Sequence, residues 1–423
     1  MSFVVATGIE CSAPLIAGGI RRDELRLTGH WTRVEEDLDL VSAMGITHLR
    51  YGIPFHVVAA EADALDWAWT DRAMAGMRER GIEPIADLMH FAVPDDLSGI
   101  GDPRLPVRYA AYARAFADRY PWVRWYTPVN EPYITALLSG RKGWWNELGT
   151  TDGAFVAALA NVVECAITGT HIVRERQPDA VFLQSDACES FRAAEPAAEP
   201  LAQHLTDRGD LGFDLTYGRR PSPAMEAWLI GNGLQPGRLE WFLEHGSSHG
   251  AIVGLDYYSG NERLVGTDGV ERPDERRGFG ALARRFHDRY GLPVMLAETN
   301  MTSAEAPAWL TEVWNDAVAL VEDGIPVAGF CWYSLTDQVD WDTCLRIAND
   351  RVNTLGLVDL DRARRPVSYV YEEAARATTR DGRPTAIALS AAVPAAALVD
   401  DGPSAAAAAV VPIDPLEDDV EAA

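Results

Sequence analysis

The sequence predicts a (β/α)8 barrel, in which eight parallel strands close into a cylinder surrounded by helices. Apolar, β-branched runs alternate with helical runs from residue 3 to about residue 377, which is the pattern of repeated βα units. About eight such units are present, enough to close a barrel. A doubly wound open sheet would need a glycine-rich phosphate turn after an early strand, and Gly18-Gly19 lacks that spacing. A chain of 423 residues can accommodate this barrel as one domain.

Each expected strand is a short run rich in apolar, β-branched or aromatic residues. The strands are predicted at residues 3–9, 46–51, 82–88, 122–129, 180–184, 251–258, 294–297 and 327–332. Apolar residues spaced three and four apart predict helices between them. These helices are expected at residues 32–44, 70–80, 106–120, 152–176, 279–290, 306–322 and 366–377.

Two internal regions and the end of the chain depart from this alternation. Residues 189–244 are looser, with short helical stretches at 225–230 and 239–245, and the polar, glycine-rich residues 261–278 predict a surface loop. From residue 378 onward Ala, Pro and Asp dominate the composition. We therefore predict a barrel domain over residues 1–377 and a disordered acidic tail over residues 378–423.

Composition limits the partners and the location. The net charge of −26 argues against a nucleic-acid or anionic-membrane partner, because phosphate binding needs clustered Lys and Arg. No stretch approaches the roughly 18 apolar residues of a membrane span. The five cysteines are scattered and form no CxxC pair, which is typical of a reducing compartment and predicts no structural zinc. The N-terminus does not resemble a signal peptide, so the predicted location is the cytoplasm.

Polar and aromatic side chains close most of the predicted strands, and a barrel brings these ends onto one face. The fourth strand stops at Pro132, which cannot donate a ladder hydrogen bond, so Glu131 lies at its end. A carboxylate at the tip of an apolar strand is costly unless it is used or paired. The residues at the strand ends are Glu10, Arg50, His90, Asn130, Glu131, Tyr257, Tyr258, Glu298, Trp332 and Tyr333.

Two of these residues, Glu131 and Glu298, form the pattern that glycosidic bond cleavage needs. One carboxyl group must protonate the leaving oxygen, and the other must attack the anomeric carbon. Aromatic faces beside them suit the C–H faces of a sugar, while His, Asn and Arg suit its hydroxyls. No cluster of His, Asp or Glu has metal-ligand spacing, so we predict neither a metal nor a cofactor.

Six segments in order carry a resemblance to glycoside hydrolase family 1, the β-glucosidase family of a large clan of retaining glycosidases. They are residues 87–94 (DLMHFAVP), 127–132 (TPVNEP), 254–259 (GLDYYS), 297–300 (AETN), 334–341 (SLTDQVDW) and 356–359 (GLVD). The resemblance extends from about Phe3 to Tyr371. It implies a retaining β-glycosidase that hydrolyses O-glycosidic bonds through a covalent glycosyl-enzyme, with a small carbohydrate or glycoside as its partner.

The resemblance also implies roles. Glu131 resembles the general acid/base and Glu298 the nucleophile, with Arg50 and Tyr258 against Glu298. The substrate-binding residues that the resemblance implies are Arg50, His90, Asn130, Tyr258, Trp332, Asp340 and Trp341.

Five positions differ from the family pattern, and one of them is Met301, which follows Asn300 where the family has a Gly. Glu10 stands near the place of a sugar-binding Gln, Asp256 replaces an Asn, and Asp340 replaces a Glu. Tyr333 falls where the family's Trp belongs, although Trp332 is adjacent. The hydrolytic pair is thus kept while the sugar-binding shell is altered. Glucose preference is therefore not implied, and a divergent near relative in the same clan fits the sequence as well.

Two other functions remain open from the sequence. A transglycosidase would use the same two glutamates and pass the sugar to an acceptor, and an apolar aglycone side that excludes water would favour it. A non-catalytic glycan-binding protein could use the same barrel, since a fold alone does not imply a function. Arg50 and Tyr258 beside the two glutamates argue against that alternative.

Overall fold

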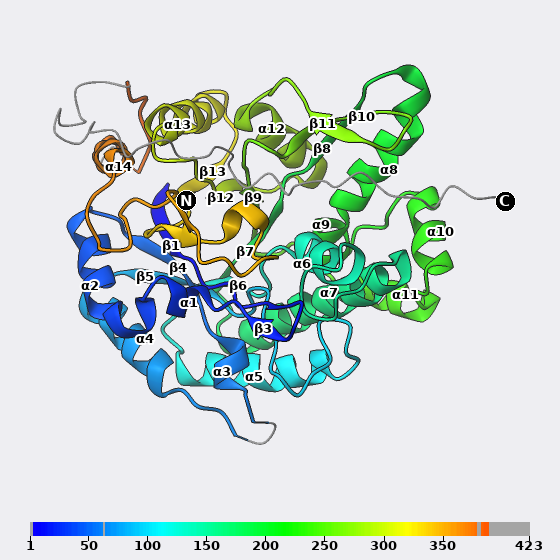
Figure 1. Cartoon of the computed structure of the whole chain (residues 1–423), viewed down its shortest axis with the longest axis horizontal. Helices are drawn as coiled ribbons and strands as arrows, with labels where there is room; N and C mark the ends of the chain where they lie inside the picture. Colours follow the sequence, from blue (N-terminus) through cyan, green and yellow to red (C-terminus); the bar gives the residue numbers. More distant parts are fainter. Residues whose placement is uncertain (1–2, 62–63, 379–381, 389–423) are drawn as a thin grey trace.

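A computed structural model describes residues 3–61, 64–378 and 382–388. Eight parallel strands form a closed barrel in the order β1-β13-β12-β9-β7-β6-β5-β4, which confirms the predicted fold class (Figure 1). β1 pairs with β4 on one side and with β13 on the other, and this last pairing closes the cylinder. The barrel strands are β1 (Val4–Ile9), β4 (His48–Gly52), β5 (Glu83–Asp87), β6 (Trp125–Thr127), β7 (Val181–Ala187), β9 (Ala251–Asp256), β12 (Val294–Glu298) and β13 (Val327–Trp332).

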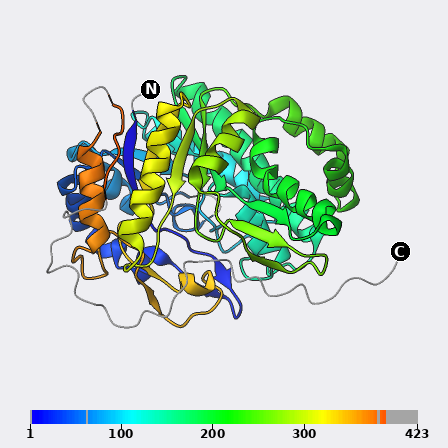
Figure 2. The ribbon, with the colours of Figure 1, turned by 90° about the horizontal axis from the view of Figure 1, so that it is seen from above.

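Helices surround the barrel, and α13 and α14 lie side by side on one flank (Figure 2). The side chain of Thr151 caps α7 by accepting a hydrogen bond from the backbone N–H of Ala154, and Gly291 ends α12 in the left-handed conformation. These local signals explain why α7 and α12 have their predicted bounds. The helices between barrel strands are α2 (His30–Ala43), α4 (Ala68–Glu79), α5 (Leu105–Arg119), α7 (Asp152–Arg176), α12 (Phe279–Tyr290) and α13 (Ala306–Glu322), and α14 (Pro366–Arg376) follows the last strand.

α7 is long and apolar enough to cross a membrane by length and composition alone. However, 78% of its most apolar window is buried inside the protein. The helix packs against α5 and α6, and its buried side chains belong to the main hydrophobic core. α7 is therefore a core helix of this protein.

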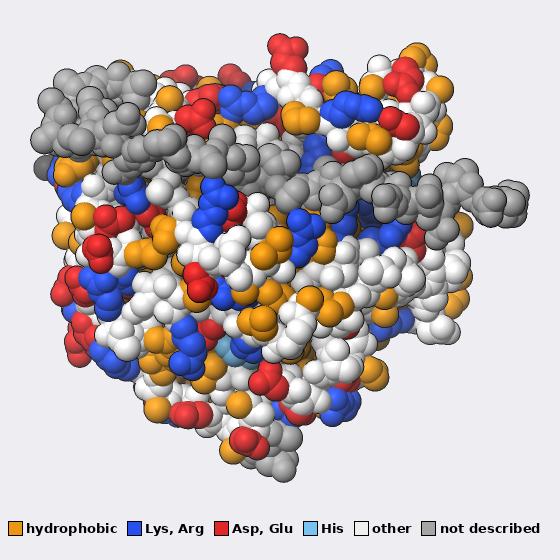
Figure 3. Space-filling model, viewed as in Figure 1, with side chains coloured by type: hydrophobic (Ala, Val, Ile, Leu, Met, Phe, Trp, Pro, Cys, Tyr) orange, Lys and Arg blue, Asp and Glu red, His pale blue; other side chains and the backbone are white. Residues whose placement is uncertain are grey.

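On the face seen in Figure 3, acidic and basic side chains are interspersed.

The segment predicted as a surface loop, residues 261–278, contains two strands instead. β10 (Glu262–Val265) is the central strand of a three-stranded sheet beside the barrel, with β11 (Glu271–Pro273) antiparallel on one side and β8 (Ser190–Ala193) parallel on the other (Figure 1). The buried Arg263 forms ion pairs with Glu271 (3.0 Å) and with Glu189 (3.5 Å). These ion pairs satisfy the polar residues, which can therefore be buried in a sheet. The loop prediction was wrong because it rested on local polarity alone.

The looser region also contains more regular structure than its sequence indicated. Its helices are η2 (Pro196–Ala198), α8 (Glu199–Gly209), α9 (Leu211–Thr216), α10 (Pro223–Gly231) and α11 (Pro236–His245). Further short elements follow the carboxyl ends of the barrel strands. They are β2 (Leu15–Ile16), β3 (Ile20–Arg21), α1 (Glu24–Leu27), α3 (Phe55–Val58), α6 (Pro132–Ala136), η1 (Leu137–Arg141), β14 (Gln338–Val339), η3 (Trp341–Thr343) and β15 (Val352–Asn353).

Residues 382–388 fall inside the predicted tail, yet they pack against the barrel domain. The backbone N–H of Phe3 donates to the carbonyl of Gly382 (3.0 Å), and Trp314 Nε1 donates to the carbonyl of Thr385 (2.9 Å). Ile387 is buried. Described residues thus pack against the barrel domain past the predicted boundary at residue 377, while residues 379–381 and 389–423 of the predicted tail lie outside the described residues.

Candidate active site

A pocket with an empty volume of about 680 Å³ lies at the carboxyl ends of the barrel strands. Glu131 follows β6 and Glu298 ends β12, and both line this pocket. The barrel thus brings together the two carboxyl groups that lie 167 positions apart in the printed sequence. Glu10, His90, Tyr258, Gln338 and Trp341 are among the other lining residues.

The carboxylate of Glu298 accepts a hydrogen bond on each of its oxygens. Arg50 reaches across from β4 and donates from Nη1 to Oε1 of Glu298. The hydroxyl of Tyr258 donates to Oε2 at 2.8 Å. Glu298 is only 4% exposed, so water does little to weaken its attraction to the guanidinium. Both partners are the ones that the sequence predicted.

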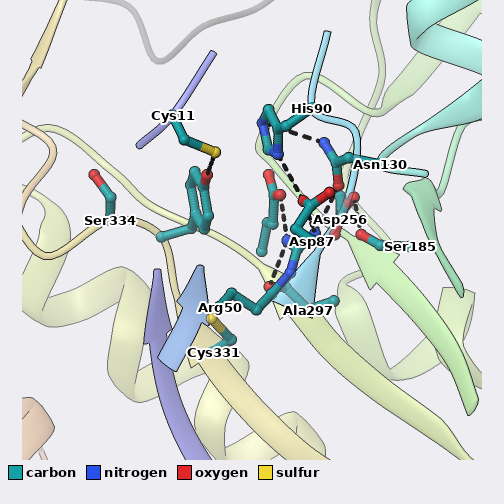
Figure 4. A network of polar contacts seen from close by, with 12 residues as sticks. Cys11, Arg50, Asp87, His90, Asn130, Ser185, Asp256, Ala297, Cys331 and Ser334 are labelled. Carbon is teal, nitrogen blue, oxygen red and sulfur yellow. Dashed lines mark hydrogen bonds and ion pairs between the residues drawn. The ribbon is translucent and has the colours of Figure 1, made fainter. Parts of the chain in front are cut away.

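Arg50 is the centre of a buried polar network (Figure 4). Its Nη2 donates to Oδ1 of Asn130 at 2.6 Å and lies 3.4 Å from Oδ2 of Asp87. The same Asp87 oxygen is 2.8 Å from Nδ1 of His90, and Asn130 Nδ2 is 3.3 Å from Nε2 of His90. Three adjacent strands, β4, β5 and β6, therefore hold the His90 ring, the Asn130 amide and Glu298 in one fixed arrangement.

Glu131 has the opposite environment. Among the described residues no donor forms a hydrogen bond with its carboxyl group, and its neighbours include the carboxyl groups of Asp256, Glu298 and Asp186. Burial, reinforced by these carboxyl groups, raises the pKa of Glu131 well above its usual range. Two carboxyl groups in one pocket with such different surroundings are suited to different roles in proton transfer.

Some of the predicted substrate-binding residues line the pocket, and others are buried away from it. His90, Tyr258 and Trp341 line the pocket, and the indole Nε1 of Trp341 is buried without a hydrogen-bond partner among the described residues. Asn130 is fully buried and lies between Arg50 and His90. The pocket-lining residues offer a sugar ring an aromatic surface and, at Trp341, an indole N–H without a partner among the described residues.

Trp332 does not lie at the pocket, and this corrects the prediction that it binds substrate. Its side chain is fully buried in the main core, where Nε1 donates to the carbonyl of Leu355 at 3.1 Å. Tyr333 takes the inner position instead, stacked on His90 with ring centroids 6.0 Å apart. Successive side chains of a strand point to opposite faces, so the one-residue difference places Tyr333 inside the barrel beside Arg50 and His90 and Trp332 outside it.

Asp340 does not reach the pocket either, contrary to the predicted sugar contact. Its carboxylate pairs with the buried Arg22 at 2.6 Å. It also accepts hydrogen bonds from the backbone N–H groups of Asn349, Asp350 and Arg351, at 3.1, 3.2 and 2.7 Å. Both carboxylate oxygens of Asp340 are thus already in use. The side chain is shorter than that of a Glu, and it turns toward its own loop rather than toward the pocket.

Gln338 and Glu10 line the pocket where the sequence led us to expect Asp340. Gln338 Nε2 is 3.4 Å from Oε2 of Glu10, and the backbone N–H of Ser12 donates to Oε1 of Glu10 at 2.9 Å. Gln338 was missed, although its place in the 334–341 segment was a signal. Glu189, Asn261 and Arg263 also line the pocket and were missed. No local signal marks these three residues, because the sheet of β8, β10 and β11 brings them there.

Comparisons with known proteins agree with this geometry. The family described as "Glycosyl hydrolase family 1" matches residues 27–182, which include Arg50, His90, Asn130 and Glu131. The chain is 25% identical over 391 residues to a β-glucosidase from Agrobacterium sp. (strain ATCC 21400), covering 78% of this chain and 80% of that protein. It is 24% identical over 378 residues to β-glucosidase 4 of Oryza sativa subsp. japonica, covering 74% and 77%.

Solved structures show the same fold. A family 1 β-glucosidase from Thermotoga maritima superimposes with a TM-score of 0.76 at 16% identity, covering 89% of this chain and 96% of that one. The Thermotoga maritima β-glucosidase in complex with deoxynojirimycin gives a TM-score of 0.75 at 17% identity, covering 90% and 98%.

Proposed function

We propose that the chain is a retaining β-glycosidase of glycoside hydrolase family 1 that acts on O-glycosyl bonds, with Glu298 as the nucleophile and Glu131 as the general acid/base. The observation that carries this proposal is the contrast between the two carboxyl groups in one pocket. Glu298 has a donor on each oxygen, whereas Glu131 has none and has a raised pKa.

In the first step Glu298 attacks the anomeric carbon, and a bond forms between that carbon and a carboxylate oxygen. The bond to the leaving oxygen breaks as the Glu131 carboxyl group gives that oxygen its proton. The raised pKa favours the protonated form of Glu131, which is the form that the first step needs. Arg50 and Tyr258 hold Glu298 in position for the attack.

In the second step Glu131 acts as a base. Once Glu298 is esterified it no longer carries a charge, so one of the contributions that raise the pKa of Glu131 is removed. Glu131 takes a proton from water, the water oxygen bonds to the anomeric carbon, and Glu298 leaves as a carboxylate. The change in charge at one glutamate thereby adjusts the proton affinity of the other.

The remaining pocket residues bind the sugar. We assign a hydroxyl contact to His90 and a stacking surface to Trp341, while the buried Asn130 holds the His90 ring, and we replace Asp340 by the pair Glu10 and Gln338. All five cysteines are free and buried, which supports the cytoplasmic location that we propose.

Azide rescue tests the assignment with two matched variants on a panel of aryl β-glycosides. In Glu298→Ala, azide takes the place of the nucleophile and should give a glycosyl azide of inverted configuration. In Glu131→Ala, an activated aryl glycoside still forms the glycosyl-enzyme, and azide should then give the product of retained configuration. Wild-type activity in Glu298→Ala, or the same stereochemistry from both variants, contradicts the proposal. Transfer of the sugar to an added alcohol in preference to water identifies a transglycosidase.

A further inference from the structure

A second cavity, with an empty volume of about 960 Å³, adjoins the active-site pocket. Glu189 and Arg263 line both cavities, so the two share a wall. The second cavity lies between the segment α6–η1, helix α8 and the small sheet of β8, β10 and β11. Part of its surface is apolar, formed by Tyr133, Leu137, Phe191, Leu201 and Leu205.

The second cavity lies on the leaving-group side of the proposed reaction. The leaving oxygen must face Glu131, and α6–η1 starts immediately after this residue. Along this segment Ile134 and Leu138 line the active-site pocket, whereas Tyr133 and Leu137 line the second cavity. One helical segment thus forms a boundary of both spaces, and the second cavity lies beside the part of the pocket that contains Glu131.

The charges in the second cavity are not balanced. Arg141 pairs with Asp152 at 2.8 Å, and Arg263 pairs with Glu271 at 3.0 Å and with Glu189 at 3.5 Å. These pairs use all the carboxylates that line the cavity.

Two further cations, Lys142 and Arg208, line the same cavity and form no ion pair with any residue that the structure describes. Nε of Arg208 is buried without a hydrogen-bond partner in the described chain. Burial lowers the pKa of the Lys142 ammonium, the carboxylate of Glu271 opposes this shift, and the neighbouring cation of Arg208 lowers the pKa further. The four cations that line this partly apolar cavity, Arg141, Lys142, Arg208 and Arg263, thus exceed its three carboxylates by one positive charge, in a chain whose net charge is −26. An anionic ligand would supply the missing charge.

We propose that the second cavity is the aglycone site and that it takes an aglycone with a carboxylate or phosphate group, which pairs with Lys142 and Arg208. The apolar wall contacts the hydrocarbon part of the aglycone. This inference rests on the proposed function, because the position of Glu131 defines the leaving-group side.

A matched pair of substrates tests the inference. The two substrates carry the same sugar on the phenol oxygen of 3-(4-hydroxyphenyl)propionate and of its amide, so the charge differs while the leaving oxygen is nearly unchanged. We expect wild type to favour the acid over the amide in kcat/KM by about tenfold, through KM. The preference should weaken as salt is added.

Variants assign that preference to its residues. Lys142→Met and Arg208→Met keep the length of the side chain and remove its charge, and each should bring the acid-to-amide ratio toward one. Lys142→Arg restores the charge and should restore the ratio. An equal rate for acid and amide in wild type, or a ratio that Lys142→Met leaves unchanged, overturns the inference.

A binding measurement separates this inference from the proposed function. Free 3-(4-hydroxyphenyl)propionate should raise the melting temperature of wild type more than its amide does, and Lys142→Met should remove the difference. If no aryl glycoside is hydrolysed but this difference is found, the proposed function fails and the anion site stands. If neutral glycosides are hydrolysed and no difference is found, the anion site fails and the proposed function stands.

Discussion

The carboxyl ends of the barrel strands and the loop that follows β13 differ in how well their sequence indicates their structure. At the strand ends, Arg50, Asn130 and Glu298 lie on the face where their positions predicted them, and they form one hydrogen-bonded network there. In the loop after β13, Asp340 is held by Arg22 and by three backbone N–H groups, away from the pocket where a sugar contact was expected.

The difference teaches which constraint places a side chain. A barrel strand has a neighbour on each side, and ladder hydrogen bonds fix its register and the face of every side chain. The side chains of a loop are instead placed by the contacts that they form with other parts of the folded chain. Asp340 pairs with an arginine 318 residues away in the sequence, and no local pattern announces that partner.

The largest effect is expected at Glu131, because it is a strand-end residue that the proposed mechanism uses twice. For glycosides with poor leaving groups, Glu131→Gln should lower kcat/KM by about 10²- to 10⁴-fold. Wild-type kcat/KM should fall as the pH rises through the raised pKa of Glu131, since the acid must be protonated, and the variant should lose this alkaline limb. pH profiles on substrates with good and poor leaving groups measure both effects, and an unchanged alkaline limb contradicts the assignment.

The same variant makes a prediction about stability. The folded-state pKa of Glu131 is raised above its unfolded value, so in the interval between the two pKa values the folded state binds more protons. Its contribution to stability is therefore present at low pH and is lost as the pH rises through the folded pKa. Glu131→Gln removes the loss of stability that accompanies ionisation of this buried carboxyl group. The melting temperature of the variant should therefore exceed that of wild type by more at pH 8 than at pH 4.

A smaller but still large effect is expected from Arg50, which joins three buried acceptors at the strand ends. Arg50→Met leaves the charges of Glu298 and Asp87 without their guanidinium and should lower kcat/KM by about 10²- to 10³-fold. The loss of one partner of a buried ion pair should also cost about 3–5 kcal/mol of stability. Urea unfolding and kinetics measure both. The control Arg50→Lys keeps the charge, so its kcat/KM should lie between those of wild type and Arg50→Met. Wild-type kcat/KM in Arg50→Met would contradict the role assigned to Arg50.

The smallest effect on activity is expected in the loop, where two variants only two positions apart should behave differently. Gln338→Ala removes a pocket amide and should raise KM about tenfold with little change in stability. Asp340→Ala leaves Arg22 buried without its main partner and should lower stability by about 3 kcal/mol while KM stays near the wild-type value. If Asp340→Ala raises KM as much as Gln338→Ala does, Asp340 also contacts the substrate, and its assignment to a purely structural role in the loop is wrong.

By itself, the sequence determined the barrel, the position of each of its strands, and the presence of Glu131 and Glu298 at one face. These features follow from the period of the apolar residues and from prolines and caps that act within a few positions. Only the tertiary structure decided that Tyr333 rather than Trp332 faces inward, that Asp340 belongs to its loop, and that β8, β10 and β11 bring Glu189 and Arg263 to the pocket. In each of these cases the deciding interaction joins residues far apart in the chain, and its free energy exists only once the barrel has brought them together.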